Sequence, residues 1–143
     1  MEKGRSPIVT AFVADASVVC SWILPDERHP IADAAFARLQ TSEAIAPQLL
    51  WYEVRNVLMV AYRRKRISFD LVLEGLAKLR KLNISTVAVE DDGVILDLAT
   101  RYQLSAYDAA YLALSLEENL ELATLDKQLI AAAPSAGCSL VRA

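Results

Sequence analysis

The chain has few of the residues that build histidine-based, disulfide-linked or disordered proteins. Its one histidine, His29, stands beside Pro30 in a turn-like stretch, which excludes a histidine-rich metal site and any triad that needs a histidine elsewhere. Cys20 and Cys138 are far apart and form no metal-ligand spacing, so we expect two free buried thiols in a reducing compartment. Only four glycines and an apolar fraction of 55% argue against disorder.

Net positive charge and long apolar runs are also absent. The formal net charge is −3, which argues against a generally basic nucleic-acid-binding surface but leaves room for one local basic site. The apolar run at residues 8–14 is too short to span a bilayer, and no cleavage pattern follows it. We therefore expect a cytoplasmic protein in which this run is an early core strand.

Short apolar segments alternate with helical patterns along the chain. Strands are expected at residues 8–14, 43–47, 84–89 and 121–125, with a further short one at 138–143. Helices are expected at residues 15–24, 29–40, 48–66, 68–82, 91–103, 104–115 and 126–133. This alternation predicts an α/β fold whose parallel sheet is covered on both faces. We expect one domain over residues 1–143, with residues 1–7 as a flexible N-terminal extension.

Four carboxylates stand where the strands of such a sheet would end, which is where ligands bind in parallel sheets. Asp15 ends the first strand, Glu53 lies in the second turn of the helix after the second strand, and Asp126 follows "ELATL". Asp108 lies in the first helical turn of the apolar stretch "LSAYDAAYLALS". Each aspartate has an alternative role as a helix cap, and Ser105 with Asp108 has the spacing of a capping box.

Together, the four carboxylates would repel one another and raise their pKa values. The sequence offers no obvious buried cation for each, whereas Mg²⁺ or Mn²⁺ would be held by such oxygen ligands. The pattern therefore favours metal-assisted hydrolysis of a phosphate ester without a covalent enzyme intermediate. Ser17 and Thr124 are candidate accessory hydroxyls, with backbone hydrogen bonding as the alternative, and Asn56 is a candidate to orient Glu53.

Four segments in this order resemble the PIN-domain family, and most of all its VapC toxins: "VADASVVCSWILPDE", "APQLLWYEVRNVL", "LSAYDAAYLALS" and "LATLDKQL". The resemblance runs from about Val9 to the C-terminus. It implies an α/β domain around a parallel sheet of about five strands, and a Mg²⁺- or Mn²⁺-dependent endoribonuclease. The family's acidic catalytic and metal-binding positions fall on Asp15, Glu53, Asp108 and Asp126, and its accessory hydroxyls on Ser17 and Thr124.

The resemblance also implies homodimers and inhibition by a cognate VapB-type antitoxin, through a peptide laid near the acidic site. The helices expected at 47–64 and 68–82 are candidates to form a hydrophobic groove for an amphipathic antitoxin helix. A basic run offers a local track for the RNA substrate, with a solvated helix end as the alternative. The run consists of Arg63, Arg64, Lys65 and Arg66.

Two other functions remain open on the sequence alone. A phosphatase of the aspartyl-phosphate type needs a second aspartate two residues after the nucleophile, where this chain has Ser17. A phospho-switch would need an acid pair such as Asp91 and Asp92, which the start of the next helix explains better as caps. A non-catalytic PIN-like binding module would be indicated by loss of one of the four acids, and all four are present.

Overall fold

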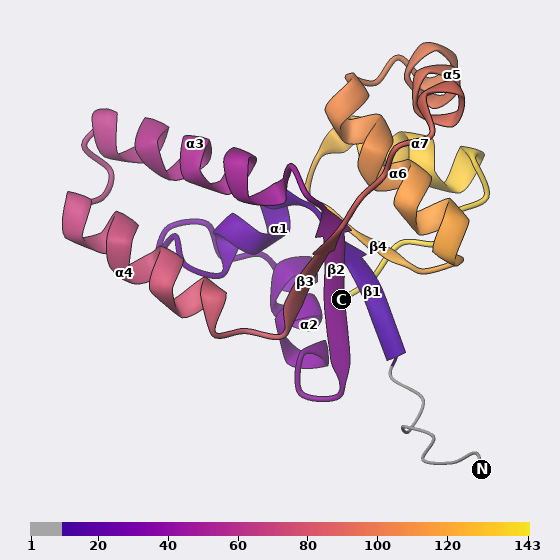
Figure 1. Ribbon diagram of the computed structural model, residues 1–143. Helices are drawn as coiled ribbons and strands as arrows, with labels where there is room; N and C mark the ends of the chain where they lie inside the picture. The colour runs from indigo at the N-terminus through magenta and orange to yellow at the C-terminus, as the bar shows by residue number, and fades with distance from the viewer. Residues whose placement is uncertain (1–9) are drawn as a thin grey trace.

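The computed structural model describes residues 10–143 and confirms the expected α/β fold (Figure 1). The strands are β1 (Thr10–Ala14), β2 (Ser42–Pro47), β3 (Ile84–Val87) and β4 (Leu122–Ala123). The helices are α1 (Ala16–Ser21), α2 (Pro30–Arg38), α3 (Leu50–Arg63), α4 (Phe69–Arg80), α5 (Asp92–Tyr102), α6 (Ala106–Glu118) and α7 (Lys127–Ser135). The extension expected at residues 1–7 lies outside the described residues.

The four strands form one parallel sheet in the order β3-β2-β1-β4. Connections from β1 to β2 and from β2 to β3 move one way across the sheet, and the connection from β3 returns past β1 to place β4 at the other edge. This reversal creates a topological switch point between β1 and β4, where α/β sheets characteristically bind ligands.

The sheet has four strands rather than about five, because the last expected strand is reduced to a single bridge. Leu140 makes an isolated parallel bridge with Leu122, supported by hydrogen bonds from Leu122 N to Ser139 O and from Val141 N to Leu122 O. Since β4 itself has only two residues, it offers little length for a longer ladder. The difference leaves the parallel architecture unchanged.

Helices lie on both sides of the sheet, and α6 packs directly against β1 and β2. In Figure 1, α3 and α4 extend together to one side, while α5, α6 and α7 gather on the other. Small buried residues of α6, Ala109 and Ala113, allow this close packing because their side chains occupy little space. Within residues 10–143, no helix combines the length and the apolar character needed to cross a membrane.

Side chains cap most helices, and the capping roles expected of Asp15 and Asp126 are confirmed as local structure, whereas Ser105 and not Asp108 caps α6. Asp15 accepts from Val18 N at the start of α1, and Asp126 accepts from Gln128 N and Leu129 N at the start of α7. His29 Nδ1 accepts from Ile31 N at the start of α2, which gives the histidine a structural partner.

Both cysteines are buried and free, as expected. Burial raises the pKa of the Cys20 thiol to about 12, with further contributions from the negative charges of Glu27, Asp15 and Glu53. A thiol in this state stays protonated and is a poor nucleophile. We therefore assign Cys20 to the packing between α1 and its neighbours and not to chemistry.

Candidate active site

Asp15 lies at the switch point, immediately beyond the last residue of β1. The register pairs Val13 with Leu122 and Ala14 with Ala123, so Asp15 comes level with Thr124 at the end of β4. The Thr124 hydroxyl donates to Asp15 Oδ2, and the Ser17 hydroxyl donates to Asp15 Oδ1 at 2.5 Å. The Asp15 residue is only 5% exposed, and these bonds hold its carboxyl group in one orientation.

The environment of Asp15 opposes its ionisation. Burial raises the pKa of this carboxyl group from 3.8 to about 6, and the negative charge of Asp108 acts in the same direction. Hydrogen bonds from Ser17, Thr124 and the backbone of Val18 favour the charged form but do not offset the loss of hydration. A cation placed beside such a buried carboxylate would stabilise its charged form.

Glu53 is brought to the same edge by α3, which begins shortly after β2 ends. The buried hydroxyl of Tyr111, on α6, donates to Glu53 Oε1 at 2.6 Å and so joins α3 to α6. Burial raises the pKa of Glu53, and the negative charge of Asp108 raises it further, while the Tyr111 bond opposes both. Burial and the charge of Glu53 raise the pKa of Tyr111, which therefore stays a hydrogen-bond donor.

Asp108 lies in the first turn of α6, and its charge interacts with those of the other three acids. The Ser105 hydroxyl accepts from Asp108 N at 3.0 Å and fixes the start of this helix. Burial raises the pKa of Asp108, the negative charge of Asp126 raises it further, and the Ser105 hydroxyl opposes these effects. Because Asp108 also acts on the pKa values of Asp15 and Glu53, it couples all four carboxylates.

Asp126 is tied to the site through its backbone as well as its charge. Its N–H donates to Thr124 Oγ1 at 3.0 Å, and Thr124 in turn donates to Asp15. One carboxylate oxygen of Asp126, Oδ1, accepts two backbone N–H groups at the start of α7. The side chain therefore combines a capping role with a position beside the other acids.

The four acids bring negative charge together at one edge of the sheet but do not form a complete metal-binding site. Across residues 10–143, no set of three or more His, Cys, Asp or Glu side chains has the geometry to hold a metal ion. The donor chemistry nevertheless fits a hard divalent cation, because the acids offer oxygen atoms alone and three of them have raised pKa values. Such a cation would offset the loss of hydration that mainly raises these pKa values, and the smaller repulsion from Asp108 and Asp126.

The accessory residues take different positions around this cluster. Ser17 and Thr124 contact Asp15 directly, and Ser17 Oγ also accepts from Leu125 N at 2.9 Å. Asn56 lines a cavity next to Glu53, while the hydrogen bond at the Glu53 carboxylate comes from Tyr111.

The basic run lies at the far end of α3 from Glu53. Arg66 donates to Asp26 Oδ1 at 2.8 Å and to Glu27 Oε2 at 2.7 Å, so its charge is largely compensated within the fold. Arg63, Arg64 and Lys65 are exposed. Arg66 therefore differs from the other three residues of the run, because acidic side chains compensate its charge.

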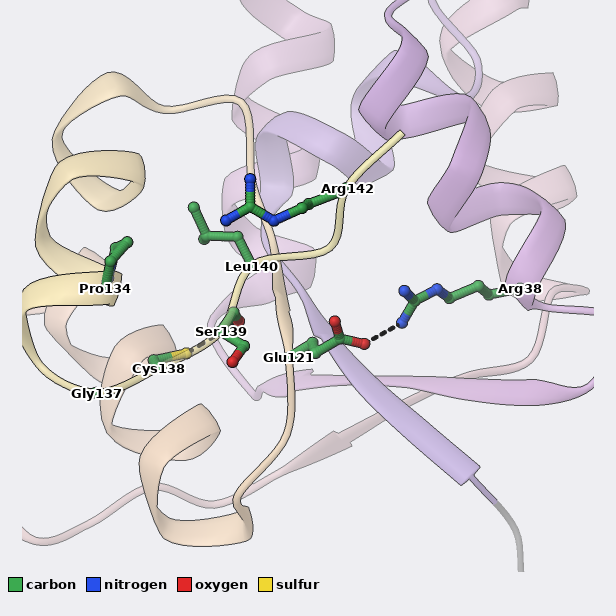
Figure 2. Close-up of a pocket in the computed structure, with 8 residues that line it drawn as sticks. All are labelled: Arg38, Glu121, Pro134, Gly137, Cys138, Ser139, Leu140 and Arg142. Atoms are coloured by element: carbon green, nitrogen blue, oxygen red, sulfur yellow. Dashed lines mark hydrogen bonds and ion pairs between the residues drawn. The ribbon is translucent and has the colours of Figure 1, made fainter.

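A different cavity, of about 520 Å³, lies at the amino edge of β4 (Figure 2). Arg142 and Cys138 line it together with Arg38, whose guanidinium forms an ion pair with Glu121 at 2.6 Å. None of the four carboxylates lines this cavity. The chemistry of the acidic cluster therefore belongs to the carboxyl edge of the sheet.

Tyr111 contacts the site but was not among the site residues expected from the sequence. Its position three residues after Asp108 in "YDAAY" places both on one side of α6, which was the available signal. Its 58-residue separation from Glu53 hides the contact from any local pattern.

Comparisons with known proteins agree with this architecture. The model of the PIN domain family matches residues 12–134. Ribonuclease VapC3 from Pyrobaculum aerophilum is 33% identical over 122 residues, which are 82% of this chain and 90% of that protein.

Two solved structures share the fold. PAE2754 from Pyrobaculum aerophilum superimposes with a TM-score of 0.68 at 21% identity, covering 87% of each chain. A chain of a toxin–antitoxin complex from Klebsiella pneumoniae gives a TM-score of 0.59 at 17% identity, covering 82% of this chain and 89% of that one.

Proposed function

This chain belongs to the PIN-domain family, and from that premise we propose that it is a Mg²⁺- or Mn²⁺-dependent endoribonuclease. The protein acts as the toxin of a VapBC-type toxin–antitoxin module. The observation that carries the proposal is the set of coupled carboxylates at the β1/β4 switch point, in a chain related to a ribonuclease. The four acids are Asp15, Glu53, Asp108 and Asp126.

These four acids would hold the divalent cation. When bound, such an ion supplies activation of the attacking water and neutralises charge on the scissile phosphodiester. Without it, the acidic edge would repel the phosphate backbone of RNA. The repulsion among Asp15, Glu53 and Asp108 makes this edge an attractive place for a cation before RNA arrives.

The chain's own residues pre-organise the acids for this role. Ser17 and Thr124 fix both oxygens of Asp15, and Tyr111 fixes Glu53 from the opposite helix. The start of α6 positions Asp108 through the Ser105 cap. Side chains held in this way need little reorganisation when substrate binds, which lowers the barrier to reaction.

The test is cleavage of total RNA by the purified, partner-free protein, with Mg²⁺, with Mn²⁺ and with chelator. We expect cleavage that requires the metal and falls by at least about a hundredfold in Asp15→Asn and Asp108→Asn, because each substitution removes a carboxylate from the proposed metal site. Asp70→Asn, an exposed aspartate in the first turn of α4, is the matched control and should retain activity.

A thermal denaturation series gives a second readout that does not depend on activity. Added Mn²⁺ should raise the midpoint for the wild type and for Asp70→Asn, since a ligand that binds only the folded state stabilises it. It should have much less effect on Asp15→Asn. Cleavage that persists in chelator or in both active-site variants would contradict the proposal.

We extend the proposal to the cognate VapB-type antitoxin and to a homodimer. An exposed apolar surface of α3 and α4 supports the antitoxin, since an amphipathic helix can lay its apolar face on such a surface. Its exposed members are Val57, Tyr62, Phe69 and Leu73.

Expression of the wild type should arrest growth, and co-expression of the antitoxin should relieve the arrest. Growth arrest by Asp15→Asn, or a monomeric mass in solution, would count against the corresponding part of the proposal.

A further inference from the structure

Two exposed tyrosines stand directly before two of the site's carboxylates. Tyr52 precedes Glu53 on α3 and is 72% exposed, and Tyr107 precedes Asp108 on α6 and is 64% exposed. Adjacent residues on a helix point about 100° apart, so each helix aims one side chain at the acids and the next one outward beside them. The two helices therefore place aromatic rings at the rim of the acidic edge.

Both rings line one cavity of about 500 Å³, together with Leu49, Glu53 and Asn56. Glu53 lines the cavity and also belongs to the acidic cluster, so the cavity lies beside the acids. The wall is aromatic and aliphatic, apart from the amide of Asn56 and the Glu53 carboxylate. The volume lies in the range of pockets that hold small organic groups.

Tyr52 is already held in position. The Arg55 guanidinium carbon lies 4.7 Å from the centre of the Tyr52 ring, and Arg55 Nε donates to Trp51 O at 3.0 Å. This cation–π contact orients the ring while leaving most of its surface accessible. A ring fixed in this way loses little conformational entropy when it binds a flat ligand.

We propose that the cavity between Tyr52 and Tyr107 binds an unpaired nucleobase of single-stranded RNA, next to the phosphate that is cleaved. This inference rests on the proposed ribonuclease function and assigns two residues that would hold a base beside the scissile phosphate. Unpaired bases stack on aromatic side chains, whereas the bases of a duplex are already stacked on one another. Tyr52 and Tyr107 are thus substrate-binding residues and not catalytic ones.

The chemistry of the cavity favours a base over the other parts of RNA. A phosphate group would be repelled by Glu53, whereas a neutral flat ring meets aromatic surface and Leu49. The Asn56 amide can donate and accept hydrogen bonds, as recognition of a base edge requires. Continuity with the acids through Glu53 places the bound nucleotide beside the predicted reaction centre.

The experiment measures binding of a fluorescently labelled single-stranded oligoribonucleotide by anisotropy, in Mg²⁺ and in an Asp15→Asn background that prevents turnover. We expect Tyr52→Ala and Tyr107→Ala each to weaken binding by about 5- to 100-fold, since base–aromatic stacking accounts for that range. Tyr→Phe at either position should bind within about twofold of the parent, because the ring is retained. A duplex of the same sequence should bind weakly to all of these proteins.

The matched control is Phe36→Ala, which removes a 46% exposed aromatic ring from α2 and should leave RNA binding unchanged. Replacing single nucleotides by abasic ones should weaken binding at one position, and that loss should vanish in the Tyr52→Ala, Tyr107→Ala double variant. Equal binding by the alanine variants, or equal losses in Tyr→Phe and Tyr→Ala, would overturn stacking. Loss of antitoxin binding with RNA binding intact would assign the cavity to the antitoxin and also overturn the proposal.

Failure of the proposal and failure of the ribonuclease function are distinguishable. Metal-dependent cleavage by the wild type, with unchanged KM and unchanged cleavage positions in the alanine variants, would leave the nuclease standing and remove the base site. RNA binding that depends on the tyrosines, by a protein that never cleaves RNA, would support the base site and contradict the ribonuclease function.

Discussion

At the scale of the residue, Asp15 combines structural and functional demands in one carboxyl group. It caps α1, accepts hydroxyl hydrogen bonds from Ser17 on α1 and from Thr124 after β4, and remains buried beside other acids. A residue needed for stability alone would not be expected to carry a pKa raised to about 6, because that shift means that folding disfavours its charge. Such stored unfavourable energy is characteristic of functional sites.

The pH dependence of stability tests this interpretation. Between pH 3.8 and about 6 the folded state keeps a proton on Asp15 that the unfolded chain releases, so stability falls as the pH rises through this window. Above pH 6, ionisation of Asp15 lowers the free energy of unfolding by its full amount of about 3 kcal/mol. Metal-free Asp15→Asn should therefore be more stable than the wild type above pH 6, by up to this amount, and should gain nothing near pH 4.

Urea denaturation in chelator, over a series of pH values, measures this difference. Asp70→Asn serves as the control, because Asp70 is exposed. A stability difference between Asp15→Asn and the wild type that does not change with pH would contradict the assigned cost of ionisation.

At the scale of the element, α6 supplies residues to both the acidic cluster and the proposed base site. Its first turns present Tyr107, Asp108 and Tyr111, while its small buried residues hold it against β1 and β2. The Ser105 cap satisfies a backbone N–H at the point where Asp108 sits. The geometry of the start of this helix therefore fixes both the proposed metal ligand and the proposed base site.

Removing that cap should affect stability and activity together. Ser105→Ala should cost about 1 kcal/mol of stability, as typical for loss of a serine cap, and should lower RNA cleavage roughly 10- to 100-fold because Asp108 shifts. Ser68→Ala removes the same kind of cap from α4, where Ser68 Oγ accepts from Leu71 N at 3.1 Å. It should cost similar stability and leave cleavage unchanged.

Chemical denaturation and initial cleavage rates separate the two effects. A similar loss of activity in both serine variants would indicate general destabilisation and would contradict the positioning role assigned to Ser105.

At the scale of the whole molecule, a protein of net charge −3 must bring RNA to an acidic edge. The exposed basic residues at the end of α3 lie about 15 Å from Glu53, given the helical rise over ten residues. Arg66 contributes little, because Asp26 and Glu27 compensate its charge. The track proposed for RNA therefore rests on Arg63, Arg64 and Lys65.

The salt dependence of RNA binding tests this track. Arg63→Ala with Arg64→Ala should weaken binding and reduce the slope of log K against log salt by about 1.4, since each lost phosphate contact accounts for about 0.7 with single strands. Arg28→Ala with Arg101→Ala makes the same change in net charge at two exposed arginines paired with Asp33 and Asp97. An unchanged slope in the Arg63→Ala, Arg64→Ala variant would mean that the basic run is a solvated helix end and not a track for RNA.

The kinds of element, their order and the edge of the sheet at which the acids would lie were all predictable from the amino-acid sequence. Hydrophobic periodicity reports locally on which face of a segment is buried, so the strands and helices were predictable from it. The acids at strand ends then followed, because the carboxyl ends of parallel strands share one edge.

Which of these groups come into contact depends on the three-dimensional packing of the elements. Thr124 reaches Asp15 across 109 residues because β4 pairs with β1, and Tyr111 reaches Glu53 because α6 lies over the sheet. The pairing of Arg66 with Asp26 and Glu27 and the cavity between Tyr52 and Tyr107 arise in the same way. These contacts depend on strand order and helix packing, which no local pattern records, since many orders bury the same apolar faces.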